Sequence, residues 1–397
     1  DVLITCGTGM TGALVKFQRI LGLKLPEPWS RTIKLSDDDR PVVFISHMEH
    51  HSNQTSWLET LAEVVVIPHN EDGLLCLHQF ADLLKKYAHR PHKIASITGC
   101  SNVTGIQTPY RDVARMIHQA GGKCFVDFAC SAPYVPIDMH PENKLERLDA
   151  IFFSPHKFLG GPSASGVLIF DRELYKNEVP DTPGGGTVSW TNPWGGHKYF
   201  DDIEVREDGG TPGFLQAIRT ALAIRLKEKM GVDKILQREH ELLDIILPGL
   251  RAIPGMHILA GHIQQRLGVI SFYIEQLHFN LAVRLLNDRF GIQVRGGCSC
   301  AGTYGHFLLE IDPKRSKSIT DQIDEGKLNE KPGWVRMSIH PTMTNEEAHL
   351  LVHACREVAT HWREWSSDYR YNPSSNEYEH VQAGEFEEKL VASQFDL

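Results

Sequence analysis

The stretch "AIFFSPHKFLGGPSASGVLIF" (residues 150–170) decides how this chain folds. Two short apolar runs, 150–154 and 166–170, flank a glycine-rich turn, and Lys157 follows the first run almost directly. A lysine at the end of a buried strand is costly unless it is exposed, paired or used covalently. The position of Lys157 therefore indicates either a surface location or a covalent partner.

Apolar runs of the same kind recur upstream, at 41–46, 63–68, 93–98 and 123–129. Amphipathic patterns typical of helices, such as 80–90 and 110–122, lie between several of them. Alternating strands and helices predict an α/β fold, with a mostly parallel sheet sandwiched by helices. In such sheets ligands bind at the carboxyl ends of the strands, so the residues that follow each strand are candidate site residues.

We expect three regions along the chain. A helical pattern that starts at Thr211 closes a large domain over residues 1–231. Residues 232–365 predict a smaller α+β domain, in which the charged stretch 312–332 is a surface insertion. The polar, acidic segment 366–397 is expected to be a peripheral or disordered tail.

Composition excludes several classes of protein. The net charge of −9 argues against a broad nucleic-acid or anionic-membrane surface. No apolar run approaches the roughly 20 residues of a membrane span, and no signal-like segment opens the chain. Eight cysteines in 397 residues are too few for a disulfide scaffold, so we expect a reducing, cytoplasmic location, an organelle not being excluded.

The segment "GTGMTGALVKF" (7–17) predicts a small-residue turn that opens a helix. Backbone N–H groups at such a helix start can hold an anion, with a hydroxyl from Thr8 or Thr11, although a plain helix N-cap explains the pattern equally well. The segment has neither a P-loop lysine nor a GxGxxG pattern, so a nucleotide is only weakly indicated.

Two further strand ends carry unusual chemistry. "SHMEHHSN" (46–53) could hold a metal, but its spacing is not HExxH, and an imidazole can instead lie over a planar cofactor. Asp127, in "VDFACSAP", is either a satisfied structural carboxylate or the partner of a cationic nitrogen.

The combination of these features indicates pyridoxal phosphate. Lys157 would form a Schiff base with the aldehyde, and Asp127 would keep the pyridine nitrogen protonated so that the ring acts as an electron sink. The helix start near Thr11 would take the phosphate.

With these residues in view, the chain resembles the class V, fold-type I pyridoxal-phosphate enzymes, in particular the cysteine desulfurase and selenocysteine lyase branch. The resemblance runs from about residue 1 to 359 and implies a fold-type I transferase with a seven-stranded sheet. Its anchors appear in the family's order: "EHHSN", "SNVTG", "VDFA", "SPHK", "GGTP", "RGGCSCA" and "VRMS".

The resemblance assigns the cofactor residues position by position. It implies that Lys157 bonds to the aldehyde, that Asp127 pairs with the pyridine nitrogen and that His51 stacks on the ring. His50 is the alternative if the register shifts by one residue.

The resemblance also assigns the phosphate contacts. Ser154, His156, Thr11 and the backbone at Met10 would bind the phosphate of their own subunit. Thr211, in "GGTP", would reach the phosphate of the neighbouring subunit, which implies a homodimer with shared active sites.

Substrate contacts follow from the same resemblance. Asn102 would lie beside the ring and the substrate, and Arg336 would clamp the substrate carboxylate, for which a bidentate guanidinium is suited. Cys300 stands where desulfurases carry the nucleophile, whereas Cys298 stands where relatives often have histidine. Cys130 replaces a glutamine that bonds the phenolic oxygen in relatives, so it is a further cofactor contact.

The implied activity is removal of sulfur from L-cysteine, giving alanine and a persulfide on Cys300, with a possible sulfur-acceptor protein as partner. Alternatives remain open: a C–S or C–Se lyase or an aminotransferase that does not use Cys300 covalently, an epimerase, or a non-catalytic scaffold. A pair of loop thiols or a metal-binding CxC would also explain "CSC", and a metallohydrolase built on His47–His51 is more remote. Relatives carry a longer N-terminal segment, so we expect this chain to be truncated and to lack part of the cover of its substrate site.

Overall fold

The computed structural model describes residues 1–30, 32–382 and 385–395. The chain divides into two compact units. Unit 1 comprises residues 1–102 and 106–236, and unit 2 comprises residues 103–105 and 237–397. Each unit is built around its own sheet and its own hydrophobic core.

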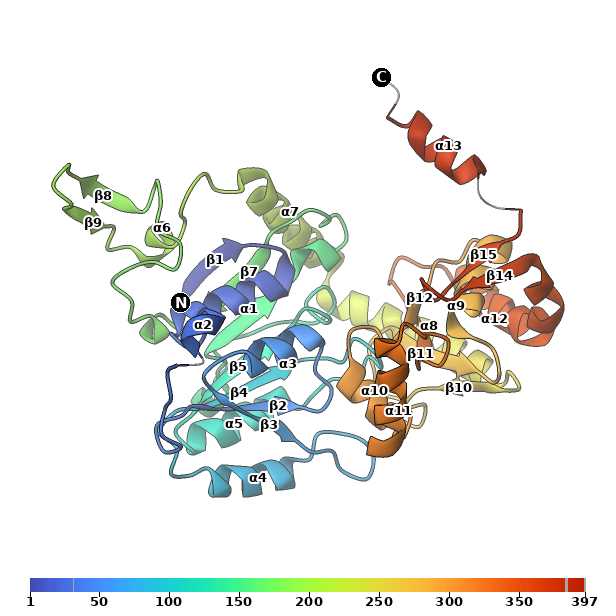
Figure 1. The fold of residues 1–397 in the computed structure, drawn as a ribbon, viewed down its shortest axis with the longest axis horizontal. Coiled ribbons are helices and arrows are strands. Elements are labelled where there is room, and N and C mark those ends of the chain that lie inside the picture. The colour runs from blue at the N-terminus through green and yellow to red at the C-terminus, as the bar shows by residue number, and fades with distance from the viewer. Residues whose placement is uncertain (31, 383–384, 396–397) are drawn as a thin grey trace. The chain divides into compact units, whose positions relative to one another are not determined.

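Unit 1 contains a seven-stranded sheet in the order β1-β7-β6-β5-β4-β2-β3 (Figure 1). β7 runs antiparallel to β1 and β6, and the remaining pairs are parallel. This arrangement confirms the expected mostly parallel sheet. The strands are β1 (Val2–Cys6), β2 (Val42–Ser46), β3 (Glu63–Ile67), β4 (Lys93–Thr98), β5 (Lys123–Asp127), β6 (Ala150–Phe153) and β7 (Gly166–Phe170).

Helices cover both faces of this sheet because alternate side chains of each strand point to opposite sides. Val43 and Ile45 share a core with Trp57 of α3 and with the apolar side of α1. Phe44, between them, packs against Phe80 of α4 on the other face, with ring centroids 5.5 Å apart. The helices are α1 (Gly9–Ile20), α2 (Glu27–Ser30), α3 (His51–Leu58), α4 (Leu77–Lys86) and α5 (Tyr110–Gln119), with 3₁₀ turns at Lys144–Glu146, Pro155–Lys157 and Arg172–Leu174.

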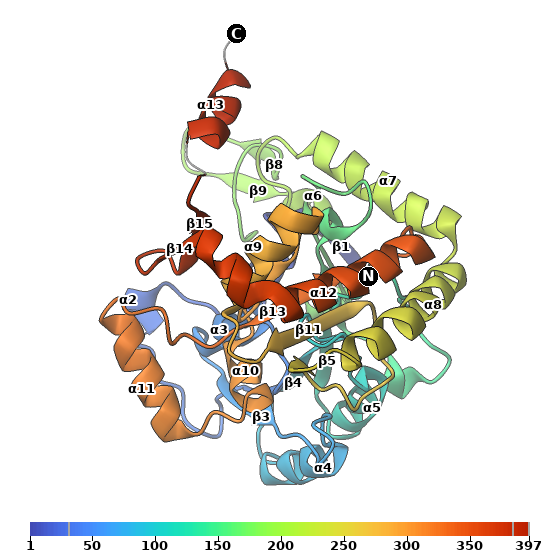
Figure 2. The ribbon, with the colours of Figure 1, turned by 90° about the vertical axis from the view of Figure 1, so that its right-hand side faces the viewer.

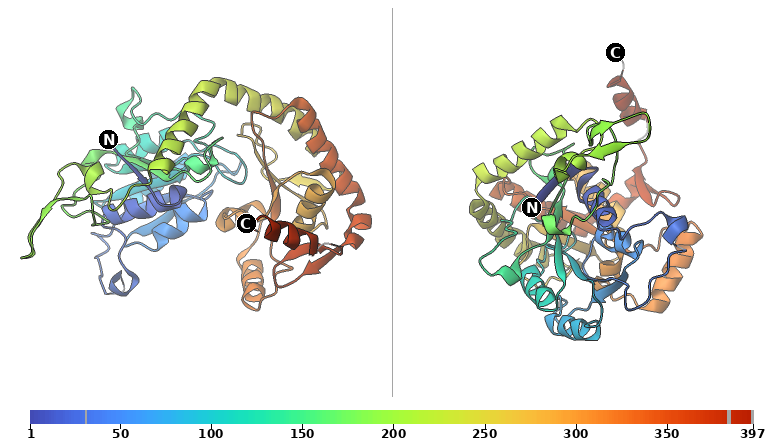
Figure 3. Two further views of the ribbon diagram at one scale, coloured as in Figure 1. Left: turned by 90° about the horizontal axis from the view of Figure 1, so that it is seen from above. Right: turned by 90° about the vertical axis from the view of Figure 1, so that its left-hand side faces the viewer.

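After β7 the chain leaves the sheet and forms a hairpin of β8 (Val188–Thr191) and β9 (His197–Tyr199). The hairpin projects from the body of unit 1 (Figure 3), and Trp194 near its tip is 88% exposed. It is followed by α6 (Ile203–Arg206) and the long helix α7 (Phe214–Met230).

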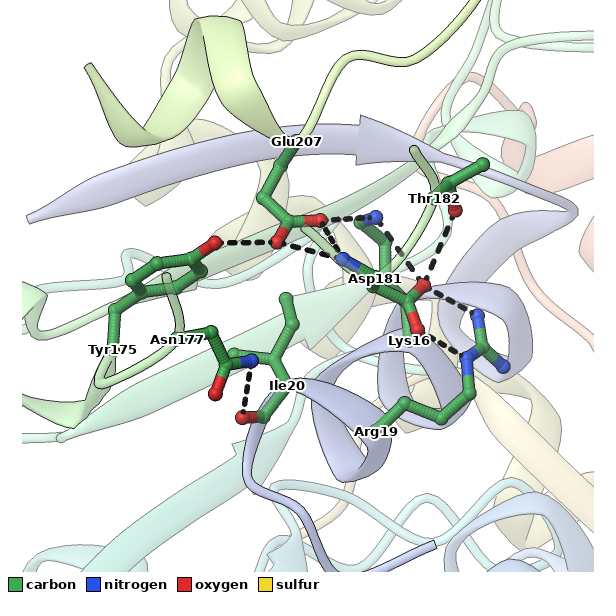
Figure 4. Close-up of polar contacts among 8 residues, drawn as sticks. All are labelled: Lys16, Arg19, Ile20, Tyr175, Asn177, Asp181, Thr182 and Glu207. Atoms are coloured by element: carbon green, nitrogen blue, oxygen red, sulfur yellow. Dashed lines mark hydrogen bonds and ion pairs between the residues drawn. The ribbon is translucent and has the colours of Figure 1, made fainter. Parts of the chain in front are cut away.

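A buried ion cluster fastens the segment around this hairpin to α1 (Figure 4). Lys16 donates to Glu207 at 2.7 Å, and Glu207 also accepts a 2.7 Å hydrogen bond from the Tyr175 hydroxyl. Arg19 forms a bidentate pair with Asp181 at 2.6 and 2.9 Å. Lys16 and Glu207 are 6% and 3% exposed, so their charges must compensate one another. The helix that opens the predicted phosphate site is thereby held in place by residues about 190 positions later in the chain.

Unit 2 contains a four-stranded antiparallel sheet in the order β10-β11-β13-β12. Apolar residues of β11 and β13 that face one side form a core with α8, α9 and α12. Figure 2 shows the ribbons of these strands and helices. The strands are β10 (Met256–Ile258), β11 (Val269–Ile274), β12 (Arg295–Gly297) and β13 (Trp334–Ser338). The helices are α8 (Val232–Arg251), whose first five residues belong to unit 1, α9 (Phe279–Phe290), α10 (Gly302–Leu308), α11 (Pro313–Asp324) and α12 (Asn345–Trp365).

The segment 312–332 contains α11, of which no residue is buried. The expectation of a peripheral tail from Ser366 is wrong for its first part. After a 3₁₀ turn (Ser366–Asp368), β14 (Tyr369–Asn372) and β15 (Glu377–His380) form a hairpin, and Tyr369 is buried with its hydroxyl donating to Asp288 at 2.9 Å. Aromatic residues at alternating positions of this segment favour strands, and this preference outweighs the tendency of an acidic composition to leave the chain disordered. A further helix, α13, spans Glu385–Ser393.

Over the described residues, no helix combines the length and the apolar composition needed to span a bilayer.

Replacing Glu207 with leucine should leave Lys16 buried without its main partner. We expect the free energy of unfolding, measured by urea denaturation, to fall by about 3 kcal/mol. Asp321→Ala, which removes the exposed partner of Lys317, is the control and should cost less than about 0.5 kcal/mol. Equal losses for the two variants would contradict a structural role for the buried pair.

Candidate active site

A cavity of about 180 Å³ lies at the carboxyl edge of the unit 1 sheet. Its lining comes from segments that follow β1, β2, β4, β5 and β6, which the parallel strands bring to one edge. It includes eight residues that the sequence singled out as cofactor contacts: Met10, Thr11, Asn102, Asp127, Cys130, Ser154, His156 and Lys157. Thr211 is exposed and is not among the lining residues of its own chain.

The start of α1 forms a cradle in this cavity. Thr8 occupies the N-cap position without a side-chain capping bond, and the first turn contains no acidic residue. The Met10 amide donates to Ser154 Oγ at 2.8 Å. At Gly9, whose φ is +64°, a Cβ would lie only 2.4 Å from Cε1 of His156. Glycine thus lets the imidazole and the serine approach the helix start, where amides and the helix dipole favour an anion.

Asp127 lines the cavity at the end of β5. Its carboxyl is 2% exposed and accepts a 2.7 Å hydrogen bond from the Ala129 amide. Burial raises the pKa of Asp127 to about 6, and the nearby charge of Lys157 opposes this rise. A carboxylate in this setting is stabilised by any cation that binds above it.

Lys157 ends the 3₁₀ turn after β6, and its side chain is exposed at the cavity. An amine that can reach both solvent and the cavity is free to bond to an aldehyde held there.

His50, rather than His51, lines the cavity. His50 is the N-cap of α3, where its Nδ1 accepts a hydrogen bond from the Ser52 amide at 3.1 Å. His51 is the first residue of α3, and partial burial lowers the pKa of its imidazole. The structure therefore favours the alternative register for the stacking histidine. His47 lies elsewhere, with Nε2 3.1 Å from the Gly73 carbonyl oxygen.

Glu49 is a buried residue that sequence reasoning missed. One of its oxygens accepts hydrogen bonds from the Ser46 hydroxyl at 2.5 Å and the Thr98 amide at 2.9 Å, and the other accepts from Asn53 at 2.8 Å. Burial raises the pKa of Glu49 to about 7, although these donors oppose the rise. Glu49 therefore joins the end of β2 to the end of β4 and fixes the backbone next to His50. The sequence did contain a signal for Glu49, because this residue is the first of the motif "EHHSN".

Lys227 was also missed, because its role depends on long-range packing of α7. Its ammonium donates to the carbonyl oxygens of Ala132 and Val135 at 2.6 and 2.5 Å. The same group lies 5.8 Å from the ring centroid of Phe158, the residue after Lys157. Burial lowers the pKa of Lys227 to about 8. Lys227 thus positions both the loop that follows Cys130 and the turn that carries Lys157.

Unit 2 contributes a second group of functional candidates. Arg336 of β13 is directly opposite Arg295 of β12 and Ser271 of β11. Val335 and Met337, on either side of Arg336, face the helices. Arg336, Arg295 and Ser271 therefore lie on the opposite face of the sheet. Two guanidiniums in register on one face repel each other, and an anion such as a carboxylate relieves the repulsion.

Cys300 lies in a tight turn just after β12. The Ala301 amide donates to the Cys298 carbonyl at 3.0 Å, and Ser299 and Cys300 have φ values of +52° and +56°. Left-handed conformations at two successive non-glycine residues are strained, and such strain is concentrated at functional sites. Nη2 of Arg295 donates to the Cys300 sulfur at 3.3 Å. Arg295, part of the quoted "RGGCSCA", was overlooked as a contact of Cys300.

The seven-stranded sheet, with its cavity at the carboxyl edge, defines a fold-type I transferase of the pyridoxal-phosphate class. Two solved structures share this fold at 23% identity: a cysteine desulfurase from Thermococcus onnurineus NA1 (TM-score 0.70, 90% of this chain and 79% of that one) and the cysteine desulfurase CsdA from Escherichia coli (TM-score 0.68, 89% and 77%).

The chain belongs to the Aminotransferase class-V family, whose profile matches residues 31–351. It is 31% identical over 263 residues to a probable cysteine desulfurase from Halalkalibacterium halodurans and 32% identical over 265 residues to a cysteine desulfurase from Escherichia coli. Each match covers 65% of this chain. The chain spans only 61% and 62% of the length of these two relatives.

The residues of the cavity fit pyridoxal phosphate. The uncapped helix start, with Ser154 and His156, supplies donors for a phosphate dianion. Asp127 is a buried acceptor for a protonated ring nitrogen, and Lys157 supplies the amine. Gly9 gives the close approach that a side chain would block.

Asp127→Asn should stabilise the cofactor-free chain at alkaline pH while weakening cofactor binding. The pKa of Asp127 is higher in the folded chain than the ordinary value near 4, so the folded state loses stability as pH rises from about 4 to 6. We expect the variant to gain on the order of 1–3 kcal/mol at pH 8 and almost nothing at pH 4, measured by urea denaturation. Its affinity for pyridoxal phosphate, followed by absorbance, should fall at least about tenfold.

Asp149 is the matched control, because the pKa of this buried carboxyl is lowered instead. Burial raises it, but hydrogen bonds from His118 at 2.6 Å and the Cys124 amide at 2.8 Å outweigh the burial. Asp149→Asn should therefore destabilise the chain at pH 8. A gain for both variants would contradict the interpretation of Asp127.

Proposed function

We propose that this chain removes sulfur from L-cysteine with pyridoxal phosphate, giving alanine and a persulfide on Cys300. The observation that carries the proposal is the hydrogen bond from Arg295 to the Cys300 sulfur. Arg295 also lies directly opposite Arg336 in the sheet. A guanidinium at this position stabilises a thiolate, and the two arginines match the carboxylate of an amino acid. Cysteine desulfurases among the relatives support the same reaction.

The residues of unit 1 would hold the cofactor in a fixed orientation. Thr11, Ser154, His156 and the backbone at Met10 would bind the phosphate, and Asp127 would hold the proton on the ring nitrogen. When bound, pyridoxal phosphate supplies an electron sink for bonds at the substrate's α-carbon.

The other residues that line the cavity have roles in proton transfer and in orienting the substrate. Lys157, which lines the cavity, would hold the cofactor through its amine, and its Nζ would move the proton at the substrate's Cα as general base and then general acid. His50 and Asn102 also line the cavity, where His50 would stack on the ring and assist proton transfer and Asn102 would orient the substrate. Cys130, whose sulfur is 3.7 Å from the Ser101 carbonyl oxygen, would contact the phenolic oxygen of the cofactor.

Arg336 and Cys300 act on the substrate itself. Arg336 binds the substrate carboxylate, which turns the sulfur toward the cysteine loop. The Cys300 thiolate attacks the substrate sulfur, the Cβ–S bond breaks, and its electron pair passes to Cβ, which is protonated to give alanine. Substrate cysteine plus the thiol therefore become alanine plus a persulfide, with no external oxidant or reductant.

Eight cysteines in 397 residues are too few for a disulfide scaffold, which supports the proposed reducing, cytoplasmic location. A sulfur-acceptor protein would then take the persulfide sulfur from Cys300.

Lys157→Ala and Cys300→Ser separate cofactor binding from sulfur removal. Added pyridoxal phosphate should give a visible absorbance band that Lys157→Ala abolishes and Cys300→Ser retains. Release of alanine and sulfide from L-cysteine should fall at least about 100-fold in Cys300→Ser. Cys76→Ser is the control, because Cys76 precedes α4 away from the cavity.

The other readings predict different outcomes. Unchanged turnover in Cys300→Ser would favour a lyase that eliminates the sulfur without covalent use of this cysteine. A chain that never develops the absorbance band would be a non-catalytic relative.

We also propose that two copies pair through α7. Four of its apolar residues recur every four positions along one side: Phe214, Ile218, Leu222 and Leu226. Their side chains, with that of Leu215, are between 36% and 77% exposed. A helix stripe of this kind normally packs against another surface, and a second copy can pair with it around a twofold axis. Thr211 lies just before this helix and would reach the partner's phosphate site.

Leu222→Glu should break this pairing. We expect the unaltered chain to sediment as a dimer and the variant to sediment as a monomer, because the pairing would bury a charge in an apolar contact. Leu350→Glu, at a residue of α12 that is 49% exposed, is the control and should remain dimeric. A monomeric unaltered chain would refute the proposal.

A further inference from the structure

Cys298 shares the strained turn with Cys300. The two residues are the first and third positions of the turn that the Ala301-to-Cys298 hydrogen bond closes. Because only two peptide units separate them, their α-carbons are at most about 7.6 Å apart, and the turn shortens this further. Both thiols are free and only partly buried.

We propose that Cys298 is a second sulfur-carrying residue, which takes the outer sulfur of a persulfide formed on Cys300. The proposal rests on the proposed function, since that reaction supplies the persulfide. It adds a step between sulfur removal and delivery of the sulfur to an acceptor.

The step balances without a further reactant. The Cys298 thiolate attacks the outer sulfur of the Cys300 persulfide, a new S–S bond forms at Cys298, and the old S–S bond breaks. The electron pair of that bond leaves with Cys300 as a thiolate, so the chain gains and loses no electrons. The outer sulfur lies about 2.05 Å beyond the Cys300 sulfur, which extends its reach toward Cys298.

Arg295 gives the transfer its direction. Its guanidinium donates to the Cys300 sulfur at 3.3 Å and so stabilises Cys300 as the departing thiolate. Thiol exchange is faster when the leaving sulfur is the better-stabilised anion. Ser299, between the two cysteines, is 2% exposed, so the turn is anchored and keeps the two thiols together.

The transfer frees Cys300 for a second substrate molecule. Without an external acceptor, the holoenzyme would therefore retain two sulfur atoms per chain before it stalls, whereas a chain with Cys300 alone would retain one.

Rapid mixing of the cofactor-loaded chain with excess L-cysteine, without any other thiol, tests this. We expect a burst of two alanines per chain and, after alkylation, persulfides at both Cys298 and Cys300 by peptide mass spectrometry. Cys298→Ser should give a burst of one alanine with the sulfur on Cys300. Cys76→Ser should behave as the unaltered chain.

The outcomes separate the relay from the function on which it rests. A burst of one alanine with sulfur on Cys300 alone in the unaltered chain would overturn the relay and leave the desulfurase proposal intact. Sulfur on Cys298 in Cys300→Ser would overturn the order of transfer, because Cys298 would then act on substrate directly. Absence of any alanine burst would refute the desulfurase proposal, and the relay with it.

Discussion

Buried charge at the carboxyl edge of the unit 1 sheet is the constraint on which the rest of the site depends. Asp127 ends β5 inside the protein with one backbone donor and a raised pKa, so its ionised form costs stability until a cation lies above it. The parallel strands place Lys157 and the start of α1 at the same edge. Cofactor binding can therefore recover free energy that folding alone leaves unfavourable.

Four other buried charged groups are compensated within the protein. Lys16 and Glu207 neutralise each other and hold α1 in position, while Glu49 is surrounded by donors that join two strand ends. The ammonium of Lys227 donates hydrogen bonds to two backbone carbonyls. These four groups keep the backbone around the cavity rigid. Asp127 is the one of the five buried charged groups that is available to bind a ligand. In unit 2 the facing pair of Arg295 and Arg336 shows the same principle with the opposite sign, since it favours an anion.

Much of this could be predicted from the sequence because strand–helix alternation and short motifs are local. The parallel sheet, Asp127, Lys157 and the helix start near Thr11 followed from residues next to strand ends. The family resemblance then added Met10, Asn102, Cys130, Ser154 and His156. The role of Lys227 could not be predicted, because its carbonyl partners lie more than 90 positions away along the chain. Glu49 and Arg295 stand within the quoted motifs, but their hydrogen bonds to Thr98 and Cys300 appear only in the folded chain. His50 lines the cavity and His51 does not because of the point at which α3 begins, and a single-residue boundary of this kind is not encoded in periodicity.

The hairpin of β14 and β15 has a consequence for the limits of unit 2. Tyr369 completes the core shared by α9 and α12, and Arg284 of α9 donates to the Tyr378 carbonyl at 2.9 Å. A shortened form that stopped where α12 ends would expose that core to solvent. We therefore expect related chains that keep α9 to keep the β14–β15 hairpin as well.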